Sequence, residues 1–512
     1  MQPLVSTALT LIQNPVACHG RWAVFIQYRR ALNAVRRPLP GGTGKSLIRP
    51  SESGNLTALS PSPCARSAPV LSPNPHSFMN PSPLILTNGR LVDGTGAPPV
   101  PDAMVWVEGE RIRFAGPAAA VSEPIPADAR VVDVRGGTIL PGLVEAHIHL
   151  TYFDVAELAD LDIKYPVEYI TLLAAANARL ALECGYTAAR SGGCLHNIDV
   201  WMKKAIDEGI VPGPRLASSG REICGAGGLM DWNPEFRKIG MEGLVFIING
   251  VEDARKAVRA LVKDGIEWVK TYPTGDAASP DVNDHHTLCM TFDEMHAVVA
   301  TAHNHKMKVT GHCRATEGIK NALRAGYDTL EHGTFMDDES LDLLLERDVP
   351  VVPGLRFEFT SVQHGKQFGM SQAVIDGHQE TLEGGAESCR RIVRAGGRLG
   401  MGGDYGFAWN PHGEYAKELT FFVQQVGLPV LDVLKAATLT GAQIMGRDHE
   451  FGTVAPGKLA DLLVVDGDVA SDISLLEDRT RFIAVVQGGK IKAGRLAGRE
   501  IPRAGDRATI RP

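Results

Sequence analysis

The chain has 512 residues, of which 44% are hydrophobic and 22% charged, and its formal net charge at pH 7 is −7. The composition is that of an ordinary globular enzyme, and the length exceeds one core, so we expect a large domain and a smaller one. An acidic chain without an apolar run of the ~20 residues that a membrane helix needs argues against nucleic acid and membranes as partners.

The first 78 residues differ from the rest in charge. They carry eight Lys or Arg and one acid, Glu52, so the remainder has a net charge of −14, and they are rich in Pro, Ser and Gly from Pro38 onward. We expect residues 1–80 to be a disordered extension. The Arg-rich, acid-poor composition also resembles that of an organelle transit peptide, whereas the interpretation that we favour has translation begin at Met79.

The eight cysteines are scattered singly along the chain, with no Cys-x-x-Cys spacing. This usage is typical of reduced thiols rather than of a disulfide scaffold, and it predicts a cytoplasmic protein.

Short alternating apolar segments near both ends predict a small β domain. The first group covers residues 84–92, 103–112 and 129–134, and the second covers 460–466 and 483–491. Asn-Gly, Glu-Gly and Pro-rich turns separate the N-terminal segments. We expect residues 81–140 and 448–500 to pair into one β-sandwich, followed by a tail at 501–512.

Between these groups, strand-like apolar runs alternate with helical stretches, as in a parallel α/β fold. Eight such runs predict a (β/α)₈ TIM-like barrel over residues 141–447, in which functional residues lie at the C-terminal ends of the strands. The predicted strands end near His149, Gly192, Ser218, Lys270, His312, His332, Gly354 and Asp404.

Polar side chains stand at several of these strand ends. His147 and His149 lie two residues apart on the first strand, so both imidazoles point to one face and can reach one metal ion. Taken singly, Lys270, His312, His332 and Asp404 could be a lysine that reaches solvent, two structural histidines and a turn aspartate. Taken together, they predict a divalent metal site, for which His and carboxylate ligands favour zinc.

These residues carry a resemblance to the metal-dependent amidohydrolase superfamily, of the binuclear type. The similarity runs from about residue 84 to residue 498, and within the superfamily it is greatest to imidazolonepropionase-like and Xaa-Pro dipeptidase-like members. The motifs that carry it are Leu140-Pro-Gly-Leu-Val-Glu-Ala-His-Ile-His149, Lys270, His312, Glu331-His-Gly333, Gly402-Gly-Asp404, Ala436-Ala-Thr-Leu-Thr-Gly-Ala442 and Gly452-Thr-Val-Ala-Pro-Gly-Lys-Leu-Ala-Asp461.

The resemblance implies two metal ions. His147, His149 and Asp404 would bind the more buried ion, His312 and His332 the more exposed one, and an N-carboxylated Lys270 would bridge both. The implied reaction is attack of a metal-bridging hydroxide on an amide-type carbonyl, with Asp404 as general acid/base and His332 as a further catalytic residue.

Substrate contacts are predicted from two residues beyond strand ends, Tyr272 and Arg356. An arginine at the mouth can pair with the carboxylate of a dipeptide or N-acyl amino acid, although Arg356 is equally compatible with a surface position. The expected partner is therefore a small molecule, and homo-oligomers are expected only by analogy.

Three alternatives stay open: a mononuclear deaminase, a hydrolase of cyclic amides of the imidazolone type, and a non-catalytic scaffold. Deaminases of the superfamily usually carry a glutamate three residues beyond the fifth-strand histidine, a position that is Ala315 in this chain. A scaffold that had lost its chemistry would be expected to lack ligands, and all six are present.

Overall fold

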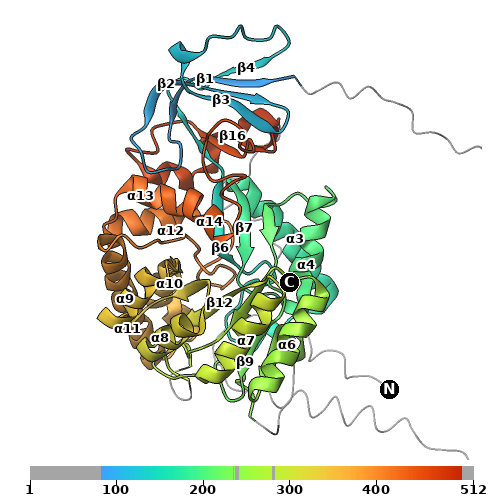
Figure 1. The fold of residues 1–512 in the computed structure, drawn as a ribbon, viewed down its shortest axis with the longest axis vertical. Helices are drawn as coiled ribbons and strands as arrows, with labels where there is room; N and C mark the ends of the chain where they lie inside the picture. Colours follow the sequence, from blue (N-terminus) through green and yellow to red (C-terminus); the bar gives the residue numbers. More distant parts are fainter. Residues whose placement is uncertain (1–81, 235, 237–240, 280–282, 499–512) are drawn as a thin grey trace, which may run out of the picture. The chain divides into compact units, whose positions relative to one another are not determined.

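The computed structural model describes residues 82–234, 236, 241–279 and 283–498, all within one compact unit that spans residues 78–512. The predictions for residues 1–80 and 501–512 lie outside the described residues. Figure 1 shows the strands and helices of the described part in chain order.

Strands from the two ends of the described chain form one sheet, in the order β17-β16-β15-β5-β1-β2-β3, with β4 paired to β1. The pairings β1–β4 and β1–β5 are parallel, so the sheet is mixed rather than purely antiparallel. The sequence pattern also predicts that strands from both ends of the chain pair with one another. That they form a β-sandwich stays a prediction. Its strands are β1 (Leu84–Leu91), β2 (Val100–Glu108), β3 (Arg111–Pro117), β4 (Arg130–Asp133), β5 (Thr138–Pro141), β15 (Leu462–Val465), β16 (Phe482–Gln487) and β17 (Lys490–Ala493).

The central strands are parallel and fall into a three-stranded sheet, β6-β7-β8, and a six-stranded sheet, β10-β9-β11-β12-β13-β14. Most of their residues are buried, as expected where helices cover the strands. The strands are β6 (Leu143–Ile148), β7 (Tyr186–Ser191), β8 (Arg215–Ala217), β9 (Glu222–Gly225), β10 (Val245–Ile248), β11 (Trp268–Thr271), β12 (Lys308–Cys313), β13 (Thr329–His332) and β14 (Val351–Val352).

Single hydrogen bonds connect these two sheets on both sides. The backbone N–H of Trp268 donates to the carbonyl of Ser218 at 3.0 Å, which links β8 to β11. On the other side, Gly400 donates to Val351 and Ala146 donates to Met401, both at 2.8 Å. Residues 399–401 thus lie between β14 and β6, in the position of the predicted eighth strand, although they make bridges rather than a regular ladder.

Helices follow most of the central strands and lie outside them (Figure 1). Local sequence sets their ends: Thr291 and Glu294 form a capping box at the start of α7, and Gly265 adopts a left-handed conformation after α6. The helices are α2 (Asp160–Ile163), α3 (Val167–Glu183), α4 (Ile198–Asp207), α5 (Met241–Leu244), α6 (Val251–Asp264), α7 (Phe292–Asn304), α8 (Thr316–Ala325), α9 (Asp338–Glu346), α10 (Leu355–His364), α11 (Gln372–Arg394), α12 (Ala416–Phe421), α13 (Val430–Lys435) and α14 (Gly441–Ile444).

The two largest of the four apolar clusters in the described part of the chain lie on the central strands and on the terminal sheet. A large core joins the central strands to their helices, and a smaller one lies on the terminal sheet around Leu86, Val105, Leu462 and Val486. Among the described helices, none combines the length and the apolarity that a membrane span needs. The six cysteines in the described ranges are buried and free.

Candidate metal centre

His147 and His149 lie at the C-terminal end of β6 with their Nε2 atoms 3.0 Å apart. Both side chains are buried. The Nδ1 atom of His149 lies 3.0 Å from the carbonyl oxygen of Gly193, which can only accept a hydrogen bond. His149 therefore carries its proton on Nδ1 and turns the lone pair of Nε2 toward His147.

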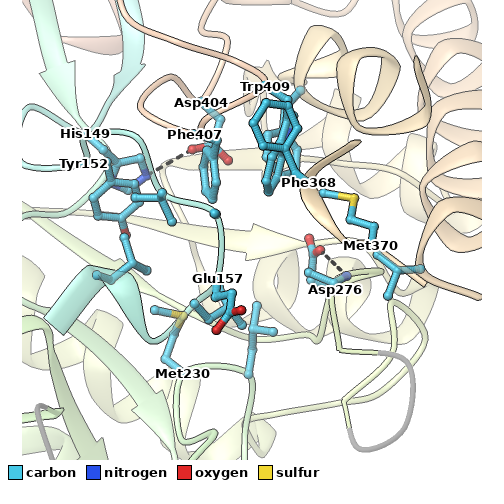
Figure 2. Close-up of a pocket in the computed structure, with 18 of the residues that line it drawn as sticks. His149, Tyr152, Glu157, Met230, Asp276, Phe368, Met370, Asp404, Phe407 and Trp409 are labelled. Carbon is cyan, nitrogen blue, oxygen red and sulfur yellow. Dashed lines mark hydrogen bonds and ion pairs between the residues drawn. The ribbon is translucent and has the colours of Figure 1, made fainter. Parts of the chain in front are cut away.

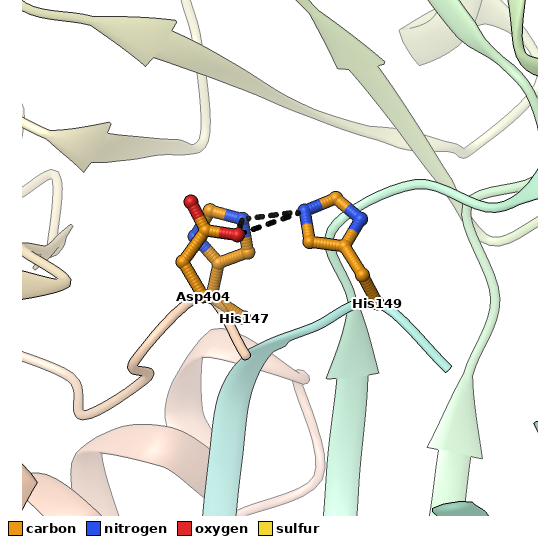
Figure 3. Close-up of side chains that lie close together, drawn as sticks. All are labelled: His147, His149 and Asp404. Atoms are coloured by element: carbon orange, nitrogen blue, oxygen red, sulfur yellow. Dashed lines mark hydrogen bonds and ion pairs between the residues drawn. The ribbon is translucent and has the colours of Figure 1, made fainter. Parts of the chain in front are cut away.

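Asp404 completes this group (Figure 3). Its Oδ1 atom lies 3.4 Å from Nε2 of His149 and 3.8 Å from Nε2 of His147, and it has no hydrogen-bond partner among the described residues. A buried carboxylate oxygen and two imidazole nitrogens thus face one point. Such a group is stable only when a cation or protons occupy that point.

His332 and His312 lie beside this group, with ring centroids 4.4 Å apart, and the ring of His332 is 5.6 Å from that of His147. Nδ1 of His332 lies 3.2 Å from the carbonyl of Pro353, so its proton is on Nδ1 and its buried Nε2 has no partner. His312 has the opposite orientation, because Nε2 lies 3.2 Å from the carbonyl of Gly275. Its Nδ1 is therefore the nitrogen with a lone pair to offer.

Lys270 is buried at the end of β11, and its Nζ contacts the carboxylate of Glu331. Arg190 also donates to Glu331, at 2.9 Å. Burial lowers the pKa of Lys270 to about 8, so a fraction of its amine is neutral at pH 7. If Lys270 were carboxylated, Glu331 would keep Arg190 as its cationic partner.

Burial also keeps the imidazoles neutral. It lowers the pKa of His147, His149 and His332 well below the usual range and that of His312 to about 4. Burial raises the pKa of Asp404 to about 7, against the opposing effect of Lys270. Neutral imidazoles with free lone pairs are the form that binds metals.

The backbone is shaped to bring these groups together. His332 and Asp404 have positive φ angles of 68° and 54°, which are uncommon for residues other than glycine and cost free energy. A Cβ at Gly192 would lie 2.7 Å from Nε2 of His147 and 3.0 Å from Nε2 of His149. Only glycine leaves room for both rings, and the donor set therefore fits a bound divalent cation.

A cavity of about 470 Å³ opens in front of this group (Figure 2). His147, His149, Lys270, His312 and Asp404 line it, as does Tyr272. Arg356 is not among its lining residues: it is buried at the start of α10 and pairs with Glu414 at 2.6 Å. The structure thus places Tyr272 at the cavity but directs Arg356 elsewhere.

Two acidic residues near the group were not predicted from the sequence. Glu222 on β9 accepts hydrogen bonds from the hydroxyls of Tyr272 at 2.8 Å and Tyr152 at 3.3 Å, and its pKa is raised by burial to about 8. Asp276 lies 3.4 Å from Nε2 of His312 and pairs with Arg314 at 2.6 Å. No sequence motif marks either residue: Glu222 begins β9, and Asp276 lies in a loop.

Comparison with known proteins places this site in a family. A model of the amidohydrolase family matches residues 138–492, more than half of the chain. The chain belongs to the amidohydrolase family. It is accordingly a hydrolase that acts on carbon–nitrogen bonds.

Individual relatives of this amidohydrolase are distant but cover most of the chain. Ochratoxinase from Aspergillus niger is 26% identical over 440 residues, which are 80% of this chain and 86% of that protein. Imidazolonepropionase from a Geobacillus species is 22% identical over 419 residues, covering 78% and 92%. A crystal structure of a Xaa-Pro dipeptidase with methionine in its active site has a TM-score of 0.72 and 27% identity, covering 80% and 99%. The family match and the structural likeness imply a TIM-barrel-like fold.

Proposed function

We propose that this amidohydrolase cleaves an amide-type bond at the site formed by His147, His149, Lys270, His312, His332 and Asp404, with two bound divalent metal ions. The observation that carries the proposal is the convergence of His147 Nε2, His149 Nε2 and Asp404 Oδ1 without a hydrogen-bond donor on the carboxylate. Buried groups of this kind need a cation or a proton between them, and the neutral imidazoles and the carboxylate are suited to a metal ion.

The residues fit two neighbouring sites. His147, His149 and Asp404 would hold one ion, His312 Nδ1 and His332 Nε2 would hold the other, and a carboxylated Lys270 would supply one oxygen to each. Nitrogen and carboxylate ligands favour zinc. When bound, such ions act as Lewis acids and lower the pKa of water from 15.7 to about 7.

Asp404 would move the proton that the reaction transfers. Its carboxylate lines the cavity and has no hydrogen bond to hold it, so it can accept a proton from the attacking water and deliver it to the departing nitrogen. His332 would be the second catalytic residue, because its Nε2 lone pair is buried, unpartnered and close to the same point.

A dipeptide or an N-acyl amino acid is the substrate class that we favour. Relatives named Xaa-Pro dipeptidase and ochratoxinase support cleavage of a carbon–nitrogen bond in a small molecule. Tyr272, which is held by Glu222, would contact that substrate. The carboxylate contact proposed for Arg356 loses its support, since that guanidinium is paired with Glu414.

Two other activities make different predictions. A mononuclear deaminase would release ammonia with one metal per chain, and the imidazolonepropionase relative favours cyclic amides as a second candidate. A scaffold without activity would need neither metal nor substrate. We further propose a cytoplasmic enzyme that acts on a small molecule, either alone or as a homo-oligomer.

The test is a substrate panel on protein purified with its native metal, with metal content measured on the same sample. Dipeptides, N-acyl amino acids and cyclic amides are offered, and both amine and ammonia release are recorded. Two metals per chain with amide cleavage support the proposal. One metal with ammonia release, or neither metal nor turnover, contradicts it.

A further inference from the structure

We infer that the amide cleaved by this enzyme carries a bulky, uncharged aromatic group, which binds against an apolar wall beside the candidate metal centre. This inference rests on the proposed function and narrows its substrate class. It comes from the lining of the cavity, in which many of the side chains are aromatic or aliphatic.

The polar lining residues of the candidate metal centre come from the ends of β6, β11 and β12 and from Asp404, and further polar residues, such as Glu157 and Asp276, come from loops. The apolar part comes from loops and from α2, α10 and α11. Its larger side chains are Phe357, Phe368, Phe407 and Trp409, with Val155, Leu158, Leu161, Leu229, Met230, Met370 and Val374. Figure 2 shows Phe407 and Trp409 on the same side of the cavity as Asp404.

The four aromatic rings form one cluster. Phe407 lies 5.5 Å from Trp409 and 4.7 Å from Phe357, and Phe368 lies 5.7 Å from Trp409, measured between ring centroids. These spacings match those of interacting aromatic pairs, so a further ring can join the cluster at a similar distance.

Phe368 shows that this wall is incomplete in the free protein. Its side chain ends the 3₁₀ turn after α10 and is 40% exposed while lining the cavity. Exposed apolar surface beside a cavity is typical of a binding site, because a ligand that covers it removes it from water.

The size and charge of the cavity narrow the ligand further. A volume of about 470 Å³ is in the range that accommodates drug-sized molecules, so a small aliphatic amide would leave much of the wall uncovered. The charged lining residues other than the proposed ligands are the acids Glu157 and Asp276. A negatively charged ring would therefore meet a like charge at Glu157, since Asp276 is paired with Arg314, whereas an uncharged ring would not.

The experiment compares matched amides. One series varies the amine among methylamine, benzylamine and naphthylmethylamine, and the other varies the acyl group among acetyl, phenylacetyl and naphthylacetyl, so that leaving-group chemistry changes little within a series. We expect kcat/KM to rise at least roughly ten-fold from the smallest to the largest member of one series. A carboxylate added to the naphthyl ring should reverse much of that gain.

Two variants connect the selectivity to the wall. Phe368→Ala should lower the ratio of kcat/KM between the naphthyl and the methyl or acetyl substrate by roughly five-fold. Phe292→Ala is the matched control, because Phe292 is also 40% exposed but lies on α7 outside the cavity lining, and it should leave that ratio unchanged.

Each failure has its own meaning. If small and aromatic amides are cleaved equally well, or if Phe368→Ala leaves the ratio unchanged, the inference is wrong while the proposed function stands. If the metal-loaded protein cleaves no member of either series or of the dipeptide panel, the proposed function itself fails.

Discussion

At the residue scale, backbone carbonyls decide which nitrogen each histidine offers. Gly193, Pro353 and Gly275 each accept from one ring nitrogen and leave the other with its lone pair. In metal sites such contacts fix the ring and its tautomer, and removing them typically costs 10- to 100-fold in affinity. Main-chain atoms therefore set the orientation of these three rings. These atoms stay in place when a histidine is substituted.

Asp404→Asn tests the proposed proton transfer. The asparagine amide cannot accept and return a proton as a carboxylate does, so kcat should fall by roughly 10²- to 10⁴-fold. The fold should persist, because asparagine also tolerates the left-handed conformation of φ 54° at this position. Steady-state kinetics with circular dichroism measures both effects. Near-normal turnover in a folded variant would refute the role of Asp404.

Gly192→Ala tests the space that both imidazoles need. The added methyl group would contact His147 and His149, so the variant should bind zinc roughly 10- to 100-fold more weakly. Gly377→Ala is the control, since its Cβ would come no closer than 3.2 Å to any atom. Competition with a chelating dye gives both affinities, and equal values would contradict the predicted fit.

Sequence could predict the candidate residues at strand ends but not their surroundings. His147, His149, Lys270, His312 and His332 end regular strands, and parallel strands end at one edge, so their proximity follows from the fold. Glu222 and Asp276 escaped prediction because only the tertiary structure brings their carboxylates to Tyr272 and His312. Arg356 was predicted to face the substrate, yet its guanidinium donates a hydrogen bond to Glu414, which lies 58 residues later in the chain.

At the element scale, seven of the eight predicted strands correspond to described strands, β6, β7, β8, β11, β12, β13 and β14. Strands β9 and β10 were missed. They pair with each other, and β9 pairs with β11, rather than continuing the predicted series. Residues 399–401 occupy the eighth position with one bridge, between Leu399 and Val351.

Glu418, on helix α12, should make the free energy of unfolding depend on pH. Burial raises the pKa of Glu418 from 4.5 to about 8, and this carboxyl group accepts the N–H of Arg356. Between these two pH values, Glu418 keeps its proton in the folded protein and loses it in the unfolded chain. The contribution of this group to the free energy of unfolding is therefore fully present below about pH 4.5 and is lost as the pH rises through 8. The Glu418→Gln variant should not lose this stability as the pH rises, because glutamine does not ionise.

Denaturant unfolding at pH 5 and pH 8 tests this prediction. At pH 8 the Glu418→Gln variant should be more stable than the parent protein, by on the order of a few kcal/mol, and near pH 5 the two should converge. Glu383→Gln, on the surface of α11, serves as the control. A difference that is the same at both pH values would argue against a raised pKa.

At the scale of the whole molecule, contacts between the terminal sheet and the central strands are both polar and apolar. Arg215 on β8 forms two hydrogen bonds with Asp461, at 2.7 Å and 3.1 Å, and the amide of Gln487 donates to the carbonyl of Thr187 at 3.0 Å. The terminal sheet is thereby tied to the ends of β7 and β8 opposite the candidate centre. Sequence could predict that both chain ends share a sheet, but not these contacts.

Metal removal should lower the stability of the whole molecule. A ligand that binds only the folded state contributes about 2.7 kcal/mol at 100 times its Kd, which for a chain of this size corresponds to a fall in Tm of roughly 3 °C on removal. Differential scanning calorimetry before and after dialysis against a chelator measures the change. An unchanged Tm in protein shown to have lost its metal would contradict the prediction that bound metal stabilises the folded state.

The most direct measurement of the central claim is a titration of metal-free protein with zinc while amide hydrolysis is followed. We predict no turnover without metal, and activity that reaches its maximum at two equivalents per chain, because the proposed function has the six residues hold two ions. Full activity at one equivalent, or turnover in protein shown to hold no metal, would contradict it.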